Sequence, residues 1–210
     1  MKSCAILGAS GHGKVIAEIA ELNGYHNIAF FDDRWPSLKS VELWDVSGDT
    51  AALLATASEY DAVVVAIGHN ATRSAKQRKL NAAGANFNVL AHPSAVISKY
   101  ADIKAGTVVM ANAVVNPFSH IGESCIINTS SIIEHDCRLA EGVHISPNVS
   151  LAGGVEVGEN AWIGIGSQVK QLVAVGRYAV VGAGSTVINN IPDSQIVVGS
   201  PAHPFIKSEK

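Results

Sequence analysis

The chain has 210 residues, of which 48% are hydrophobic and 16% are charged, so it can bury a substantial core and is not composed like a disordered protein. Its formal net charge of −3 argues against broad nucleic-acid binding, which needs a basic surface. No apolar run is long enough to span a bilayer, and glycines interrupt the first apolar run before a signal-peptide core could form. We therefore expect a cytoplasmic protein that binds neither nucleic acid nor membranes.

The first 90 residues alternate short apolar strands with helical segments. The expected strands cover residues 3–7, 28–31 and 60–67, and the expected helices cover residues 15–23 and 70–83. The last helix is rich in Ala and carries four cations that we expect on its solvent-exposed side: Arg73, Lys76, Arg78 and Lys79. This alternation is typical of a small, parallel, Rossmann-like α/β domain.

A glycine-rich segment, GASGHGK at residues 8–14, follows the first strand and opens a helix. Backbone N–H groups at such a turn suit a phosphate or pyrophosphate. Asp32 follows the second strand, where dinucleotide-binding folds place an acid that binds ribose. The glycine spacing matches neither a Walker A motif nor GxGxxG, and the domain is half the usual size for NAD binding. A tight turn without a ligand remains an alternative.

From residue 97 onward, an aliphatic residue recurs at every sixth position without a gap. The sixteen positions are Ile97, Ile103, Val109, Val115, Ile121, Ile127, Ile133, Leu139, Ile145, Leu151, Val157, Ile163, Val169, Val175, Val181 and Val187. Neither an α-helix nor a two-sided sheet has a period of six. Three such segments, each a short strand and a corner, close a triangular coil with the aliphatic residues inside. We therefore expect an α/β domain at residues 1–90 and a left-handed parallel β-helix at residues 91–210.

Two histidines in the repeat region are separated by half a coil. His135 is followed by Asp136, and His144 lies nine residues further on, so the two histidines fall on opposite sides of the prism. They cannot share a site within one chain, but a three-fold packing of parallel prisms can bring His135 of one chain to His144 of the next. One coil beyond His135 is Gly153, whose free backbone N–H can hold an oxyanion. A corner glycine without a catalytic role is the alternative.

Several motifs together carry a resemblance that covers nearly the whole chain. They are GASGHGK, FFDD, AIG, the His135–Asp136 pair, His144 and the closing VVGSPA. The chain resembles the hexapeptide-repeat sugar acyltransferases with an N-terminal α/β domain, a group that includes sialic acid O-acetyltransferases and UDP-4-amino-sugar N-acetyltransferases of bacillosamine synthesis. The resemblance implies acetyl-CoA-dependent N-acetylation of a nucleotide-linked 4-amino-4,6-dideoxy sugar, with UDP favoured. O-acetylation of sialic acid or another sugar is the alternative.

The same resemblance implies a role for each motif. His135 would be the general base, Asp136 would raise its basicity, and no metal would be needed. Acetyl-CoA would contact His144, Ile165 and Ala183 and would border the loop at residues 199–202. The nucleotide sugar would contact Ser10, Gly11, His12, Asp32, Asp33 and Gly68. Because His135 and His144 would serve one site, we expect a homotrimer with sites between neighbouring chains.

Three other classes of protein remain as alternatives. A metal-dependent hydratase on the same fold would use His120, His135 and His144, although their spacings of 15 and 9 residues lack the close pairing of such sites. A nicotinamide-dependent oxidoreductase would use the α/β half. A sugar-nucleotide-binding scaffold would have the same binding residues without catalysis.

Overall fold

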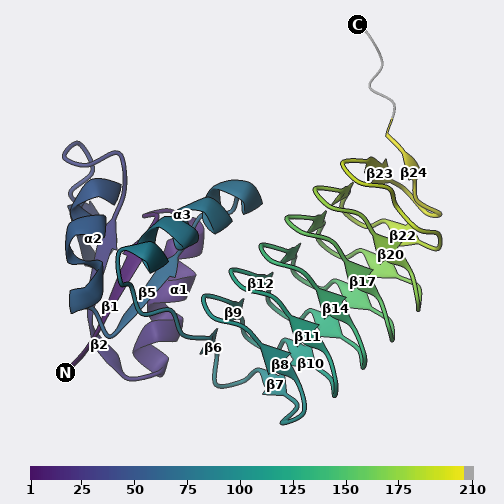
Figure 1. The fold of residues 1–210 in the computed structure, drawn as a ribbon, viewed down its shortest axis with the longest axis horizontal. Coiled ribbons are helices and arrows are strands. Elements are labelled where there is room, and N and C mark those ends of the chain that lie inside the picture. The colour runs from purple at the N-terminus through teal and green to yellow at the C-terminus, as the bar shows by residue number, and fades with distance from the viewer. Residues whose placement is uncertain (206–210) are drawn as a thin grey trace, which may run out of the picture.

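An α/β domain forms the first part of the chain in the computed structural model, which describes residues 1–205 (Figure 1). Its strands are β1 (Lys2–Leu7), β2 (Tyr25–Phe31), β3 (Ser40–Val41), β4 (Trp44–Gly48) and β5 (Ala62–Val65). They form one sheet in the order β3-β4-β2-β1-β5, in which only the edge strand β3 runs antiparallel to its neighbour. The helices are α1 (Gly11–Leu22), α2 (Thr50–Thr56) and α3 (Asn70–Ala82), and η1 (Ala57–Glu59) is a 3₁₀ turn.

The elements predicted for this domain are confirmed, with two differences. Helix α1 begins at Gly11, four residues earlier than predicted, so half of the glycine-rich segment is helical. Gly13 allows this early start, because a Cβ at that position would collide with the carbonyl oxygen of Gly8. The second difference is a stretch that we did not assign, where β3, β4 and α2 form. β3 (SV) has only two residues, and β4 (WDVSG) mixes polar with apolar residues, so neither has the continuous apolar run seen in β5 (AVVV).

The parallel β-helix predicted from the hexad repeat is confirmed. Each of the sixteen predicted aliphatic residues is the second residue of a two-residue strand, and each strand from β7 to β19 pairs in parallel with the strand eighteen residues further on. These side chains fill the interior of the prism. At the corners, left-handed backbone conformations recur at residues such as Gly106, Asp136 and Gly142.

We name the three faces of the prism by their strands. The β7 face contains β7 (Val96–Ile97), β10 (Val114–Val115), β13 (Ile132–Ile133), β16 (Ser150–Leu151), β19 (Gln168–Val169) and β22 (Thr186–Val187). The β8 face contains β8 (Asp102–Ile103), β11 (His120–Ile121), β14 (Arg138–Leu139), β17 (Glu156–Val157) and β20 (Ala174–Val175). The β9 face contains β6 (Leu90–Ala91), β9 (Val108–Val109), β12 (Ile126–Ile127), β15 (His144–Ile145), β18 (Trp162–Ile163), β21 (Val180–Val181), β23 (Ile196–Val198) and β24 (His203–Pro204).

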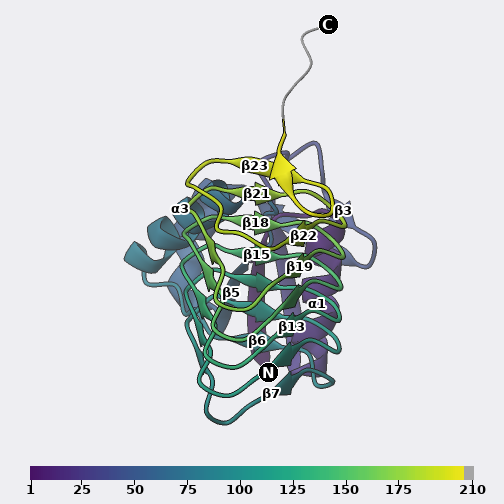
Figure 2. The same ribbon diagram turned by 90° about the vertical axis from the view of Figure 1, so that its right-hand side faces the viewer.

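The α/β domain packs against one side of the prism, beside its first coils (Figure 1), and lies behind the coils in the view of Figure 2. An apolar cluster joins the two parts, because Ile16 of α1 and Phe30 of β2 share it with Val108, Met110 and Ile126 of the β9 face. On the other face of the five-stranded sheet, α2 and α3 cover a separate cluster. The β9 face is therefore the side of the prism that meets the α/β domain.

Helix α3 makes the second contact between the two parts, along the corner between the β8 and β9 faces. The prediction that all four of its cations face solvent is wrong for Arg73, which is only 2% exposed. Arg73 packs against the β-helix, whereas Arg78 and Lys79 are exposed as predicted. The longest helix among residues 1–205 has 13 residues, and none of the helices described there is long and apolar enough to cross a membrane.

Candidate active site

His135 lies at the corner between the β7 and β8 faces, directly after β13. Its ring is 63% exposed, and its Nδ1 lies 2.8 Å from Oδ2 of Asp136. Asp136 has a left-handed backbone conformation (φ 61°), which Asp tolerates better than most residues and which turns its carboxylate toward the ring. A neutral imidazole that donates its Nδ1 proton to this carboxylate presents an unprotonated Nε2 to solvent. The pair is thus arranged as a base with an orienting acid.

Gly153 lies beside the ring of His135, one coil further along. A Cβ at position 153 would be 2.6 Å from Cε1 and 2.7 Å from Nε2 of His135, so only glycine leaves room for the imidazole. The N–H of the following residue, Gly154, donates to the carbonyl of His135 and fixes the register of the two coils. Within residues 1–205 no group accepts a hydrogen bond from the N–H of Gly153. An unpaired N–H in the residue that packs against the His135 ring can donate to an oxygen that develops negative charge.

His144 lies on β15 of the β9 face and is half-buried. Its ring stacks on Trp162 of the next coil, with 5.8 Å between centroids and 6° between planes. Its Nε2 is 3.3 Å from Nδ2 of Asn128. Burial, with smaller contributions from the nearby Arg73 guanidinium and His12, lowers the pKa of His144 to about 3. His144 is therefore neutral near pH 7, where it can donate or accept a hydrogen bond.

A cavity of about 410 Å³ lies between the start of α3 and the β9 face. Its lining includes Gly68 and Asn70 from the α/β domain and His144 and Trp162 from the β-helix. A second hollow of about 250 Å³ adjoins it, because both are lined by Trp162 and Val180. Ile165 and Ala183 line this second hollow. The structure thus places the three residues predicted for acetyl-CoA, His144, Ile165 and Ala183, along one strip that begins beside Gly68.

The predicted nucleotide-binding residues gather around the start of α1. Asp32 accepts hydrogen bonds from the N–H of Ala9 (2.8 Å) and from the Arg34 guanidinium (2.7 and 2.9 Å). The hydrogen bonds from Arg34 hold the pKa of Asp32 well below its usual range. Asp32 therefore braces the loop between β1 and α1 as a carboxylate. Ser10 and Gly11, at the start of the helix, are both exposed.

Two further predicted residues frame this region. Asp33 accepts hydrogen bonds from the N–H of Thr50 and from the ammonium of Lys76, each at 3.0 Å. His12 is largely buried in the first turn of α1, and burial lowers its pKa to about 4. Its Nε2 is buried and has no hydrogen-bond partner among the described residues.

The candidate residues form two separate groups within the described chain. His135, Asp136 and Gly153 occupy the corner between the β7 and β8 faces, whereas His144 lies on the β9 face, opposite that corner. This arrangement agrees with the spacing argument that the two histidines cannot meet within one chain. His120, on the β8 face, joins neither group, and residues 1–205 contain no cluster of three His, Cys, Asp or Glu side chains suited to a metal ion.

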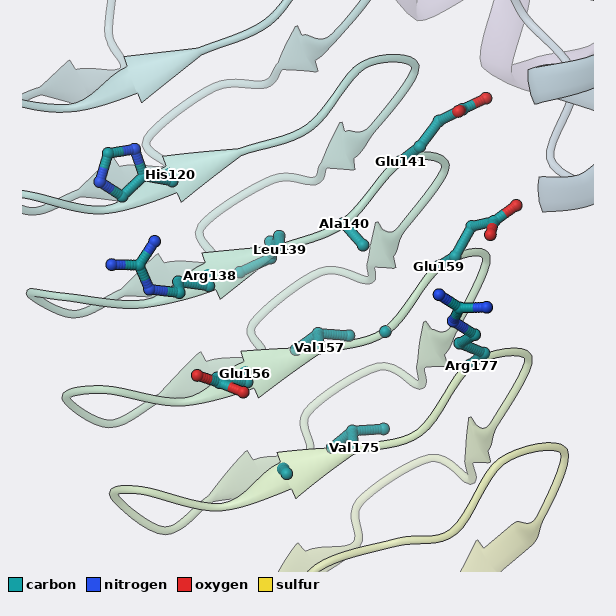
Figure 3. Close-up of a pocket in the computed structure, with 12 residues that line it drawn as sticks. His120, Arg138, Leu139, Ala140, Glu141, Glu156, Val157, Glu159, Val175 and Arg177 are labelled. Atoms are coloured by element: carbon teal, nitrogen blue, oxygen red, sulfur yellow. The ribbon is translucent and has the colours of Figure 1, made fainter.

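A larger hollow, about 540 Å³, lies elsewhere, over the β8 face (Figure 3). His120, Arg138 and Glu156 follow one another on successive strands, and Glu159 and Arg177 lie at the neighbouring corner (Figure 3). It is an open depression with charges of both signs, and it contains none of the predicted catalytic residues. This hollow therefore coincides with neither group of predicted site residues.

Sequence reasoning missed Asn70 and Trp162 near the cavity, and it placed Arg73 in solvent. Trp162 follows His144 by eighteen residues, so the coil length alone would have placed it next to that histidine. Asn70 and Arg73 belong to a buried polar face of α3, which a search for apolar periodicity cannot detect.

Comparison with known proteins supports the expected relationship. Residues 3–80 match the family model of the PglD N-terminal domain. UDP-N-acetylbacillosamine N-acetyltransferase of Bacillus subtilis is 37% identical over 113 residues, and the match spans about half of each protein (53% of this chain and 52% of the relative).

Two solved structures match almost the whole chain. The acetyltransferase domain of PglB from Neisseria gonorrhoeae, in complex with acetyl coenzyme A, is 40% identical with a TM-score of 0.93 and covers 97% of this chain and 99% of its own. A histidine-to-asparagine variant of perosamine N-acetyltransferase from Caulobacter crescentus, in complex with CoA and GDP-perosamine, is 35% identical with a TM-score of 0.94. The match covers 99% of this chain and 98% of the Caulobacter crescentus chain. With this full-length similarity to acetyltransferases and with the PglD domain at its start, the chain belongs to the PglD family of hexapeptide-repeat acetyltransferases.

Proposed function

We propose that this protein transfers the acetyl group of acetyl-CoA to the amino group of a nucleotide-linked 4-amino-4,6-dideoxy sugar. The observation that carries the proposal is the His135–Asp136 pair beside Gly153, on a chain that matches an acetyl-coenzyme-A-bound acetyltransferase domain over 97% of its length. The strip from His144 to Ile165 and Ala183 gives acetyl-CoA an extended, mainly apolar path.

The residues of the His135 corner fit direct transfer. The sugar amine attacks the thioester carbonyl carbon while Nε2 of His135 accepts a proton from the amine. Asp136 holds Nδ1–H and stabilises the imidazolium that forms. The N–H of Gly153 donates to the oxygen that becomes negative as the C–N bond forms. When the C–S bond breaks, His135 returns the proton to the departing thiolate, so the products are the amide and CoA thiol. A covalent acetyl-enzyme is not required.

The proposal includes a homotrimer. His135 of one chain lies opposite the β9 face of the same chain, so a complete site needs the His135 corner of one chain and the His144 strip of another. Parallel prisms arranged about a three-fold axis give three identical sites of this kind.

The α/β domain is the proposed holder of the nucleotide sugar. Ser10, Gly11 and His12 at the start of α1, with Gly68 beside the cavity, offer exposed backbone and an unpartnered imidazole. Relatives named for UDP-N-acetylbacillosamine and in complex with GDP-perosamine support an amino sugar linked to a nucleotide. Both of these relatives are N-acetyltransferases, which favours N-acetylation over sugar O-acetylation for this chain. The Bacillus subtilis relative favours UDP as the nucleotide.

The test is release of CoA thiol by the purified protein. UDP-, dTDP- and GDP-linked 4-amino-4,6-dideoxy sugars would be compared at equal concentration with acetyl-CoA, and sialic acid would be the hydroxyl acceptor. We expect turnover with an amino-sugar nucleotide and the highest kcat/KM with UDP. Turnover with sialic acid alone would replace the proposal by O-acetylation, and binding without thiol release would indicate a non-catalytic scaffold.

A further inference from the structure

Helix α3 docks on the β-helix through polar side chains. Its buried face consists of Asn70, Arg73, Ser74 and Gln77, spaced by three and four residues as on one side of an α-helix. The corner between the β8 and β9 faces receives this side at Gly106 and Gly142. Any side chain at these two corner glycines would collide with Gln77 and with Ser74, respectively. The helix is thus held unusually close to the coils.

Arg73 is the centre of this contact. Its Nε donates to the carbonyl of Ser124 (2.8 Å), and its Nη2 donates to the carbonyl of Gly142 (2.7 Å), so it grips two successive coils. Its Nη1 donates to the carbonyls of Ile67 (3.0 Å) and Gly68 (3.3 Å), in the loop that leads into α3. One guanidinium therefore joins the loop of the α/β domain to the β-helix.

The environment of this guanidinium is unusual for a residue that serves stability alone. Arg73 forms none of the ion pairs found among residues 1–205, so backbone carbonyls alone compensate its buried charge. Burial lowers the pKa of Arg73 to about 10, which leaves it charged at neutral pH. Burying a charge costs desolvation free energy, and an apolar side chain would pack the helix against the coils without that cost. What an apolar side chain cannot supply is the fixed fork of donors that sets the distance between three backbone segments.

One of those segments, the loop that leads into α3, borders the cavity that holds His144. Gly68, which accepts from Nη1, lines the cavity on the side of the α/β domain. Asn70 lines it as well, and its Nδ2 donates to the carbonyls of Asn160 (3.1 Å) and Ala161 (3.0 Å) on the β-helix side. The width of the cavity between Gly68 and His144 therefore depends on contacts made by the first turns of α3.

We propose that Arg73 is a positioning residue that fixes the loop at residues 67–70 relative to the β-helix, so that a nucleotide sugar held at Gly68 presents its amino group at the acetyl-transfer site. This role rests on the proposed function. Arg73 acts through the carbonyls of Gly68, Ser124 and Gly142 and does not touch the substrate. Ile165 and Ala183, further along the proposed acetyl-CoA path, line a hollow to which this loop contributes no residue, so we expect acetyl-CoA binding to change much less than sugar-nucleotide binding when the loop shifts.

The kinetic test compares R73K with R78Q. The first keeps the buried charge but loses the fork of donors. The second is the matched control, because Arg78 lies on the same helix and reaches the same corner through an exposed ion pair with Glu141. For R73K we expect kcat to fall at least tenfold and KM for the sugar nucleotide to rise at least fivefold, with KM for acetyl-CoA within twofold. For R78Q we expect all three constants within twofold. If R73K does not fold, N70A is tested in its place. This variant removes the hydrogen bonds from Asn70 to the carbonyls of Asn160 and Ala161, and we expect it to change the same constants in the same direction.

A purely structural role would lower the amount of active enzyme and leave both KM values unchanged, and that result would overturn the proposal. Hydrogen exchange gives a readout that needs no turnover. We expect R73K to speed exchange at residues 67–71 at least tenfold, while exchange in strands β12 and β15 stays as in the wild type. If the wild type acetylates no amino sugar, the proposed function fails and the exchange result alone decides the role of Arg73. Unchanged exchange at residues 67–71 would refute it.

Discussion

The imidazole of His135 lies so close to the backbone of Gly153 that a Cβ at position 153 would be 2.6 Å from Cε1. The two residues are one coil apart, and the hydrogen bond from the N–H of Gly154 to the carbonyl of His135 fixes that spacing. The absence of a side chain at Gly153 thus decides where the ring of His135 can lie.

We expect Gly153→Ala to lower kcat at least about tenfold, because the new methyl group must displace the ring of His135. Thermal unfolding should change little, since the displaced ring is exposed. Gln171→Ala is the control, because Gln171 lies at the same corner one coil further on and is exposed. A variant with wild-type kcat would show that the ring position is not critical.

We expect His135→Ala to lower kcat by roughly 10²–10⁴, the usual contribution of general-base catalysis. Asp136→Asn should lower kcat by a smaller factor, because it alters the orientation and basicity of the His135 ring without removing the ring. Steady-state kinetics at saturating acetyl-CoA measure both effects. A loss of less than fivefold for His135→Ala would remove this residue from the mechanism.

Ser10→Tyr tests the nucleotide site. Ser10 is exposed immediately before α1, so a large side chain there blocks the start of the helix without disturbing the core. We expect a higher KM for the sugar nucleotide and an almost unchanged KM for acetyl-CoA. Ser58→Tyr, at an exposed position after α2, is the control and should alter neither constant. An unchanged sugar-nucleotide KM for Ser10→Tyr would place the nucleotide elsewhere.

Stability should fall as the solution becomes acidic, because burial holds the pKa of His144 at about 3 and that of His12 at about 4 in the folded state. Above pH 6.5 both residues are neutral in the folded and unfolded chains. As the pH falls from 6.5 to about 4, the two histidines bind protons in the unfolded chain but remain neutral in the folded chain. The free energy of unfolding therefore decreases.

His144→Gln removes one of these groups. From pH 7 to pH 5, we expect the variant to lose on the order of 1–2 kcal/mol less unfolding free energy than the wild type. Urea denaturation at the two pH values measures the difference. Equal losses in the two proteins would mean that His144 does not resist protonation in the folded state.

Complementation tests the shared site. Chains carrying His135→Ala and chains carrying His144→Ala would be mixed, unfolded, refolded together and assayed. Mixed trimers then contain some sites in which both histidines survive, each from a different chain, so we expect activity above that of either parent. The experiment requires His144→Ala to be strongly impaired alone. No recovery in mixed trimers, or a monomeric mass in solution, would contradict the model.

The architecture of the β-helix could be predicted because its period is a local property of the sequence. The aliphatic residues from Ile97 to Val187 each end a strand, and a coil of eighteen residues places His135 next to Gly153 and His144 next to Trp162. The same arithmetic separates His135 from His144. In a repeat with fixed rise, spacing along the chain becomes distance in space.

The contact between the two parts of the chain could not be predicted in this way. Arg73 was expected in solvent, because a cation on an Ala-rich helix normally faces water, yet it is buried against Ser124 and Gly142, 51 and 69 residues away. Its partners are backbone carbonyls, which every residue has, so no side-chain pattern marks them. Which carbonyls turn toward Arg73 was decided by the docking of α3 on the corner of the prism, and only the tertiary structure contains that information.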